Sequence, residues 1–388
     1  MLTTAHHHEH SMHGPRLAVD PHNVVVGLLC PIGDTLFATP ALAALRRRFP
    51  RAYITALAYR SNAGILEGNP AINECVVVDP GKVQPLLLRL VRAVGTVEWS
   101  EYDLMINFSP ASSFVGLIGG VRDQVHMKMP RHWWLVGGRD SQYRSQHSID
   151  HYLRLVQPLL TSDLSEEERI PRIYLDGKHR AAARRLLRER HLTPANQFVT
   201  MHVGADGFQG RKRWSPGRFA TVAKLIAERF DMHVLLLGGT ADFERSTEVA
   251  EAIGSRAVVL AGHTSLMETA ALIERSILFI GNDSCPLHIA AAVGAPAVGI
   301  YGPTSAQEFG PVGRMGYRQR VVHAGLPCSP CFHFVGNNAP WVPNLCYSYA
   351  CLKAIQPEDV IAAATSLLRE DMTKPVCGVT PPSEAPTH

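Results

Sequence analysis

The chain has 388 residues, of which 46% are hydrophobic and 19% charged, and its formal net charge is +4 at pH 7. This length is too great for one ordinary hydrophobic core, and the mild positive charge excludes a dedicated nucleic-acid binder while it suits an anionic ligand. No apolar run reaches the roughly 18 residues that cross a bilayer, and the N-terminus lacks the apolar centre of a signal peptide. We therefore expect a cytoplasmic protein, with peripheral contact to the inner membrane left open.

In the first half of the chain, apolar runs alternate with helical patterns. Strands are predicted at residues 23–29, 53–57, 75–78 and 104–107, and the first is followed by a helix with Leu42, Leu45 and Phe49 on one face. This alternation predicts a parallel sheet with right-handed crossovers. Residues 110–150 are less regular and could form one wall of a cleft, and a basic helix over 179–190 leads out of the domain.

A second alternating series follows. Strands are predicted at 198–203, 234–237, 258–260, 278–280 and 297–300, and helices at 216–230, 265–275, 287–293 and 357–368, with one more helix ending at 253. Ser215 is a candidate N-cap, and Ser265 with Glu268 has the spacing of a capping box. The whole pattern predicts an α/β protein of two Rossmann-like domains that face a central cleft, where ligands bind beyond the carboxyl ends of the strands.

The sharpest candidate site is GNDSCP, residues 281–286, which joins a predicted strand to a helix. Backbone N–H groups and the positive end of the helix dipole meet there, and Ser284 and His288 add further donors, so the segment predicts an anion site. The alternative is an ordinary capped helix in which Asp283 and Ser284 only satisfy the helix N-terminus.

Three further loops follow predicted strands. Residues 207–216 (GFQGRKRWSP) carry Lys212 between two arginines, which suits a diphosphate, although a solvated basic loop is the alternative. PIGDT places Asp34 at the end of the first strand, where a carboxylate could accept a proton or could only cap a helix. GGTADFER offers Asp242 and Glu244, which could bind ribose hydroxyls or lie on a polar surface turn.

These segments also resemble a known family. GDTLFATPALAALRRRFPRAYI resembles the N-terminal motif of glycosyltransferase family nine, the ADP-heptose:lipopolysaccharide heptosyltransferases. GRKRWSPGRF, LLGGTADFER, GHTSLMETAALI, FIGNDSCPLHIAAAVGAPAVGIYGPT and GPVG resemble its C-terminal motifs in the same order. The resemblance covers most of residues 23–368 and implies the GT-B architecture.

Composition and pattern predict disordered tails at 1–20 and 372–388, two domains at 21–192 and 193–326, and a Cys-rich segment with a terminal helix at 327–371. The resemblance implies that the first domain binds the acceptor and the second the nucleotide sugar. Asp34 matches the family's catalytic base, Lys212 its diphosphate-contacting lysine, and Asp283 the acidic residue of its donor loop. The predicted donor-binding residues are Gly33, Thr35, Lys212, Asp242, Glu244, Asp283, Ser284, Cys285 and His288. The family inverts the anomeric centre and needs no metal for transfer.

One departure concerns Cys285, where the family usually has glycine. If this turn requires a positive φ, a side chain strains it and could change the donor. The resemblance as a whole implies that the protein moves a heptose from ADP-heptose to a lipopolysaccharide core sugar. The alternatives are a protein hydroxyl as acceptor, another nucleotide sugar as donor, and a binding protein without activity.

A cluster of cysteines lies near the C-terminus. Cys328 and Cys331 are separated by two residues, Cys346 follows after fourteen, and Cys351 after four more. Two close pairs predict a structural four-thiolate site for zinc or iron, and four reduced thiols are the alternative. A similar iron-bound finger occurs in the protein-modifying branch of the family.

Overall fold

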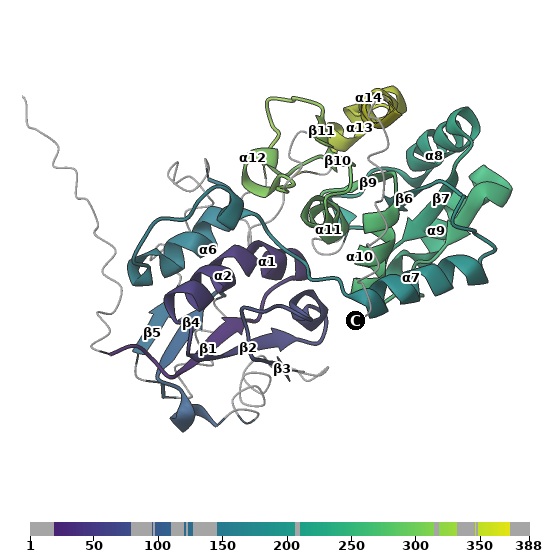
Figure 1. Cartoon of the computed structure of the whole chain (residues 1–388). Coiled ribbons are helices and arrows are strands. Elements are labelled where there is room, and N and C mark those ends of the chain that lie inside the picture. Colours follow the sequence, from purple (N-terminus) through teal and green to yellow (C-terminus); the bar gives the residue numbers. More distant parts are fainter. Residues whose placement is uncertain are drawn as a thin grey trace, which may run out of the picture.

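The computed structural model describes residues 19–78, 95, 98–109, 120–121, 123–126, 146–205, 210–313, 318–331, 346 and 348–372. Within them the chain forms two parallel α/β units, which lie side by side in Figure 1. This confirms the predicted pair of Rossmann-like folds. Most of the two predicted tails and most of the irregular region 110–150 lie outside the described residues.

The first unit is a five-stranded sheet in the order β3-β2-β1-β4-β5. Its strands are β1 (Asn23–Leu28), β2 (Tyr53–Tyr59), β3 (Glu74–Val78), β4 (Leu104–Asn107) and β5 (Asp123–His126). Central β1 is almost wholly buried because helices α1 (Ile32–Phe37), α2 (Thr39–Arg48) and α6 (Ser148–Val156) cover one face and a smaller cluster around Trp99 covers the other. The strand order reverses between β1 and β4, so a ligand site is expected where β1 ends.

The second unit is a six-stranded parallel sheet in the order β11-β10-β9-β6-β7-β8. Its strands are β6 (Phe198–His202), β7 (His233–Leu237), β8 (Ala257–Val259), β9 (Leu278–Asn282), β10 (Ala297–Tyr301) and β11 (Gln319–His323). Its helices are α7 (Gly177–Glu189), α8 (Pro216–Phe230), α9 (Phe243–Ile253), α10 (Leu266–Arg275), α11 (Cys285–Val293), α12 (Ala306–Phe309), α13 (Ala350–Ala354) and α14 (Pro357–Met372). The order reverses between β6 and β9, and apolar clusters fill both faces.

Local signals explain several boundaries. The Ser265 side chain accepts from the Glu268 backbone N–H at 3.2 Å, and the Glu268 carboxylate accepts in return from the Ser265 N–H, which confirms the predicted capping box. Ser215 occupies the N-cap position of α8, but its side chain makes no capping hydrogen bond. Six of the described helices and strands were not predicted: β5 and β11, which are short edge strands with polar sequences, and the helices α1, α6, α12 and α13.

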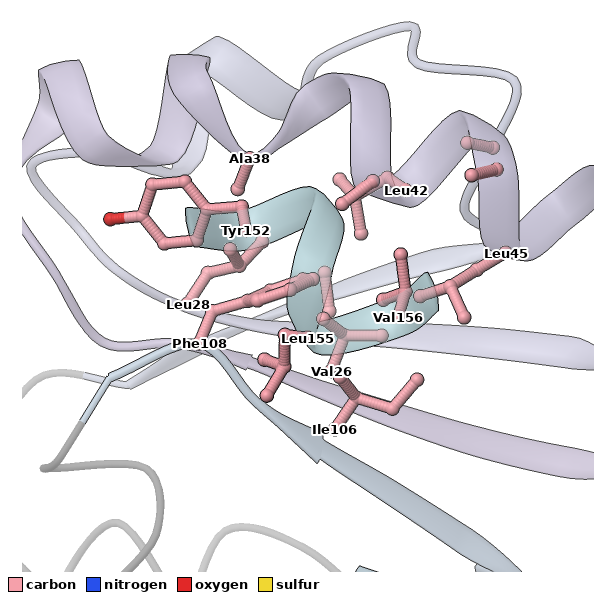
Figure 2. Packing of buried hydrophobic residues seen from close by; sticks show 14 of the residues in the cluster. Val26, Leu28, Ala38, Leu42, Leu45, Ile106, Phe108, Tyr152, Leu155 and Val156 are labelled. Atoms are coloured by element: carbon pink, nitrogen blue, oxygen red, sulfur yellow. The ribbon is translucent and has the colours of Figure 1, made fainter. Parts of the chain in front are cut away.

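Helix α6 escaped prediction because its N-cap is a histidine. The ring Nδ1 of His147 accepts from the Ile149 N–H at 3.2 Å, a role that serine, threonine, asparagine or aspartate usually takes. Tyr152 of this helix packs edge-on against Phe108 at 5.6 Å between ring centroids. Figure 2 shows Tyr152, Leu155 and Val156 seated between the helix layer and strands β1 and β4.

The two units contact each other through α6 and α12. The Ser148 hydroxyl donates to the Glu308 carbonyl at 3.0 Å, and His147 Nε2 lies 2.9 Å from the Gly310 carbonyl. A cavity of about 680 Å³ opens beside this contact, lined by His147 and Asp150 from the first unit and by Val312 and Gly313 from the second. This cavity lies between the units, but its lining includes neither Asp34 nor any of the predicted donor-binding residues. No helix of the described residues is long and apolar enough to span a membrane.

Candidate active site

Asp34 lies in the first turn of α1, directly beyond the end of β1. Its Oδ1 accepts a hydrogen bond of 2.9 Å from the Tyr152 hydroxyl. Burial raises the pKa of Asp34 above its ordinary value, and the hydrogen bond from Tyr152 and the positive charge of Lys212 oppose that rise only in part. The site therefore contains a carboxylate that binds a proton more readily than an ordinary aspartate.

The neighbours of Asp34 in its loop have structural contacts. The Thr35 side chain is fully buried, and its hydroxyl lies between the Pro31 carbonyl and the side-chain amide of Asn62, so the structure does not place it where a donor would bind. Gly33 lies against the second unit, since a Cβ built on it would come 3.7 Å from the His288 ring. Both residues shape the loop that presents Asp34.

A second charged group is centred on Asp283, which follows β9. Lys212 Nζ donates to Asp283 Oδ2 at 2.8 Å, and His288 Nε2 lies 3.6 Å from Oδ1. Burial alone would raise the pKa of Asp283, but the charge of Lys212 and the hydrogen bond from His288 hold it well below its ordinary value. The structure thus brings three predicted donor-binding residues together.

The Asp34 carboxylate and the Lys212–Asp283–His288 cluster face each other across the two units. Lys212, His288 and Asp283 all act electrostatically on the Asp34 carboxylate, although they belong to the other sheet. The ring of Phe37 lies 4.6 Å from that of His288 and 5.2 Å from that of His147, measured between centroids. A reacting group between Asp34 and Lys212 would therefore meet a proton acceptor on one side and a positive charge on the other.

Trp214 explains how the basic loop is held. This residue follows Lys212 by two positions and is 1% exposed, its backbone N–H donates to Asn282 Oδ1 at 3.0 Å, and its indole N–H donates to the Ile355 carbonyl at 3.1 Å. These contacts hold the end of the loop beside Lys212 against the core of the second unit.

The Ser284 side chain contacts a histidine that the sequence analysis did not single out. Its Oγ lies 3.0 Å from Nδ1 of His202, the last residue of β6, and His202 Nε2 lies 3.3 Å from Asp242 Oδ2. Sequence reasoning missed His202. The available signal was a lone histidine at the end of an apolar strand, just where ligands meet a parallel sheet.

The other predicted donor residues lie nearby. Glu244 is exposed in the first turn of α9, whereas Asp242 is 2% exposed and already paired. Cys285 begins α11 and is not among the described non-glycine residues with positive φ, so the strain considered from the sequence is not present.

The predicted metal site is not supported. Within the described part of the chain, no group of three or more His, Cys, Asp or Glu side chains could hold a metal ion. Cys351 is packed into the apolar core of the second unit through α13, whereas Cys328 and Cys331 are exposed. Burial raises the pKa of Cys331, and the charges of Cys351, Cys346 and Cys328 raise it further, so the thiols lie within electrostatic range without forming a ligand set.

Two facing Rossmann-like units, with a carboxylate on one and a partly buried lysine paired with Asp283 on the other, have the architecture of a GT-B glycosyltransferase. The family described as glycosyltransferase family 9 (heptosyltransferase) matches residues 100–341, more than half of the sequence, and the chain belongs to this family. It is therefore a transferase that acts on sugars.

Individual relatives agree. The chain is 26% identical over 359 residues to lipopolysaccharide heptosyltransferase 3 of Escherichia coli K12, covering 87% of this chain and 96% of the relative. Its fold is similar to that of a family 9 glycosyltransferase from Veillonella parvula, with a TM-score of 0.72 and 24% identity over 90% of this chain and 98% of the other. It is also similar in fold to the dodecameric iron-containing heptosyltransferase TibC of enterotoxigenic E. coli in complex with ADP-D-β-D-heptose, with a TM-score of 0.55 and 13% identity over 92% of this chain and 80% of the other.

Proposed function

We propose that this protein transfers a heptose from ADP-heptose to a sugar of the lipopolysaccharide core, with Asp34 as general base. The observation that supports this most directly is the Asp34 carboxylate, held by Tyr152 and facing the Lys212–Asp283–His288 cluster of the other unit. The pairing of a proton acceptor with a diphosphate-binding cation matches the two needs of sugar transfer from a nucleoside diphosphate.

In the proposed mechanism the acceptor hydroxyl attacks the anomeric carbon of the donor while Asp34 takes its proton. The bond from that carbon to the diphosphate breaks, and ADP leaves with increased negative charge. Lys212 and the N–H groups at the start of α11 stabilise that charge. A single displacement inverts the anomeric centre, so we expect inversion and full activity in EDTA.

The adenine nucleotide is proposed from the family and from the ADP-heptose bound by TibC. We assign the Lys212–Asp283 pair and α11 to the diphosphate, and Glu244, which is exposed at the start of α9, to the ribose. The departure at Cys285 does not argue for another donor, because this residue adopts ordinary helical geometry.

For the acceptor, a lipopolysaccharide core sugar is favoured over a protein hydroxyl. The relative that is 26% identical over 87% of this chain is named as a lipopolysaccharide heptosyltransferase, whereas the likeness to TibC, at 13% identity, concerns the fold. Such an acceptor is anchored in the inner leaflet of a membrane, so we also propose that the protein works in the cytoplasm at that surface. We also propose that the first unit binds the acceptor and the second unit the donor, as predicted for 21–192 and 193–326; helix α7, which lies before position 192, packs in the core of the second unit.

The test combines purified protein, ADP-heptose and core-truncated lipopolysaccharide, with product mass and ADP release as readouts. We expect a mass increase of one heptose with ADP-heptose and none with UDP-glucose or GDP-mannose. Asp34→Ala should abolish transfer while calorimetry still detects ADP binding, because Asp34 is assigned to the acceptor proton. Transfer from a uridine or guanine donor, or unchanged activity of Asp34→Ala, would refute the proposal.

A further inference from the structure

The contacts of His202 assign it a role that neither the family match nor the motifs indicate. It ends β6, the strand at which the order of the second sheet reverses, and is 4% exposed. The loops after the two neighbouring strands meet its ring from either side. Ser284, after β9, lies at Nδ1, and Asp242, after β7, lies at Nε2.

Asp242 is held as an anchor for this ring. Its Oδ2 also accepts from the Gly239 N–H at 3.1 Å, and its carboxylate lies against Gly204, where a Cβ would come 2.0 Å from Oδ1. Burial alone would raise the pKa of Asp242, but the hydrogen bond and charge of His202, the Gly239 N–H and the charge of Arg213 lower it. A buried and ionised carboxylate can only accept, so His202 Nε2 must carry a hydrogen.

The Ser284 hydroxyl carries one hydrogen, so it can donate only one hydrogen bond at a time. Its single hydroxyl hydrogen has two possible acceptors in the free protein, His202 Nδ1 at 3.0 Å and the Asn282 carbonyl at 3.1 Å. A phosphate oxygen at the N-terminus of α11 would also need that hydrogen, because phosphate only accepts. Ser284 can donate to phosphate and keep its contact with His202 only if Nδ1 donates as well.

We propose that His202 is a positioning residue that takes up a proton when the donor diphosphate binds, and thereby turns the Ser284 hydroxyl into a donor to that diphosphate. This inference rests on the proposed function. The proton comes from solvent, no covalent bond changes, and Asp242 supplies the counter-charge to the imidazolium. The other charged groups around this point are Arg213, beside Asp242, and Asp283, which precedes Ser284 and carries Lys212 and His288.

The experiment is calorimetry of ADP-heptose binding to the full chain in two buffers of equal pH and different ionisation enthalpy. ADP-heptose is a diphosphate diester without a group that titrates near neutral pH, so proton uptake reports on the protein. We expect uptake in the wild type. Binding without uptake would overturn the inference alone, whereas no binding at all would overturn the proposed donor and this inference with it.

Two variants of His202 test the contacts of its two ring nitrogens one at a time. His202→Asn keeps an amide near the Nδ1 position and can donate to Ser284 without a proton, so we expect binding close to wild type and no uptake. His202→Gln reaches Asp242 but not Ser284, so we expect affinity to fall about tenfold or more, with no uptake. Uptake that persists in both variants would contradict the assignment.

Matched controls guard against a merely structural effect. Thr200 lies two residues earlier on the same face of β6 and bonds Ser276 at 3.0 Å, so Thr200→Val should lower the melting temperature without changing proton uptake. If His202→Gln does not fold, Ser284→Ala provides the second test, because it removes the hydroxyl and should reduce uptake. Full uptake by Ser284→Ala would overturn the inference.

Discussion

Replacing Tyr152 by phenylalanine removes the one hydroxyl that the structure places on the Asp34 carboxylate, at 2.9 Å. The ring is 2% exposed and packs on Phe108, so phenylalanine fills the same space and the fold should persist. The hydroxyl stabilises the ionised form of Asp34 because a carboxylate is the stronger acceptor. Its loss therefore raises the pKa of Asp34 still further, and a larger share of the enzyme carries a protonated base at any given pH.

The size of the effect follows from the kind of bond. A hydrogen bond to a charged group contributes about 1.5–3 kcal/mol, and each 1.36 kcal/mol changes the ratio of the two protonation states tenfold. On the acidic side of the profile, kcat/KM of Tyr152→Phe should fall about tenfold or more, and the acidic limb should move to higher pH. At pH values where Asp34 is ionised in both proteins, the rates should converge.

The assay is kcat/KM for heptose transfer across the pH range, with melting temperature measured alongside. Tyr53→Phe is the matched control, since Tyr53 is 46% exposed and lies at the far end of the first sheet. An equal loss of rate at every pH, or an acidic limb that does not move, would refute the assignment of Tyr152 as the residue that tunes Asp34.

Three further predictions follow from the site. Asp34→Asn should lower the rate of transfer about a hundredfold or more, yet raise the melting temperature at neutral pH. Folding raises the pKa of Asp34, so the ionised carboxylate destabilises the folded state at pH values above its unfolded pKa, and the neutral amide removes that penalty. Lys212→Ala should lower the free energy of unfolding in urea by about 3 kcal/mol, because Asp283 is 2% exposed and loses its ammonium partner, whereas Lys212→Arg should recover most of it. Gly204→Ala should push Asp242 aside and cost about 1–3 kcal/mol in the same assay, and stability equal to wild type would contradict the packing described.

The sequence predicted most of the strands because buried parallel strands are continuous apolar runs, as in residues 24–28 and 234–237. It also placed Asp34 and Asp283 at strand ends, and the structure brings these two ends within electrostatic range of each other. It could not show that Tyr152 contacts Asp34, because the two are separated by 118 positions and α6 begins without a recognisable cap.

The roles of the two acidic residues after β7 and of the cysteines could be assigned only from tertiary packing. Asp242 and Glu244 are equivalent in a linear sequence, and only the structure shows that one is buried against Gly204 while the other is exposed. The cysteine spacing predicted a ligand set, but spacing does not reveal that Cys351 points into an apolar core. Pattern therefore located the loops, and tertiary contacts decided what each side chain does.

Helix α6 has a mechanical consequence. Its first turn grips the second unit through Ser148 and His147, and its next turn carries Tyr152 against Asp34. A rotation that separates the two units would displace the first turn of α6, because that turn contacts the second unit. A helix of nine residues would then tilt as a whole. The contacts that join the two units and the hydrogen bond that Tyr152 donates to Asp34 therefore belong to one nine-residue helix, so a change in the angle between the units would reach the Asp34 carboxylate through α6.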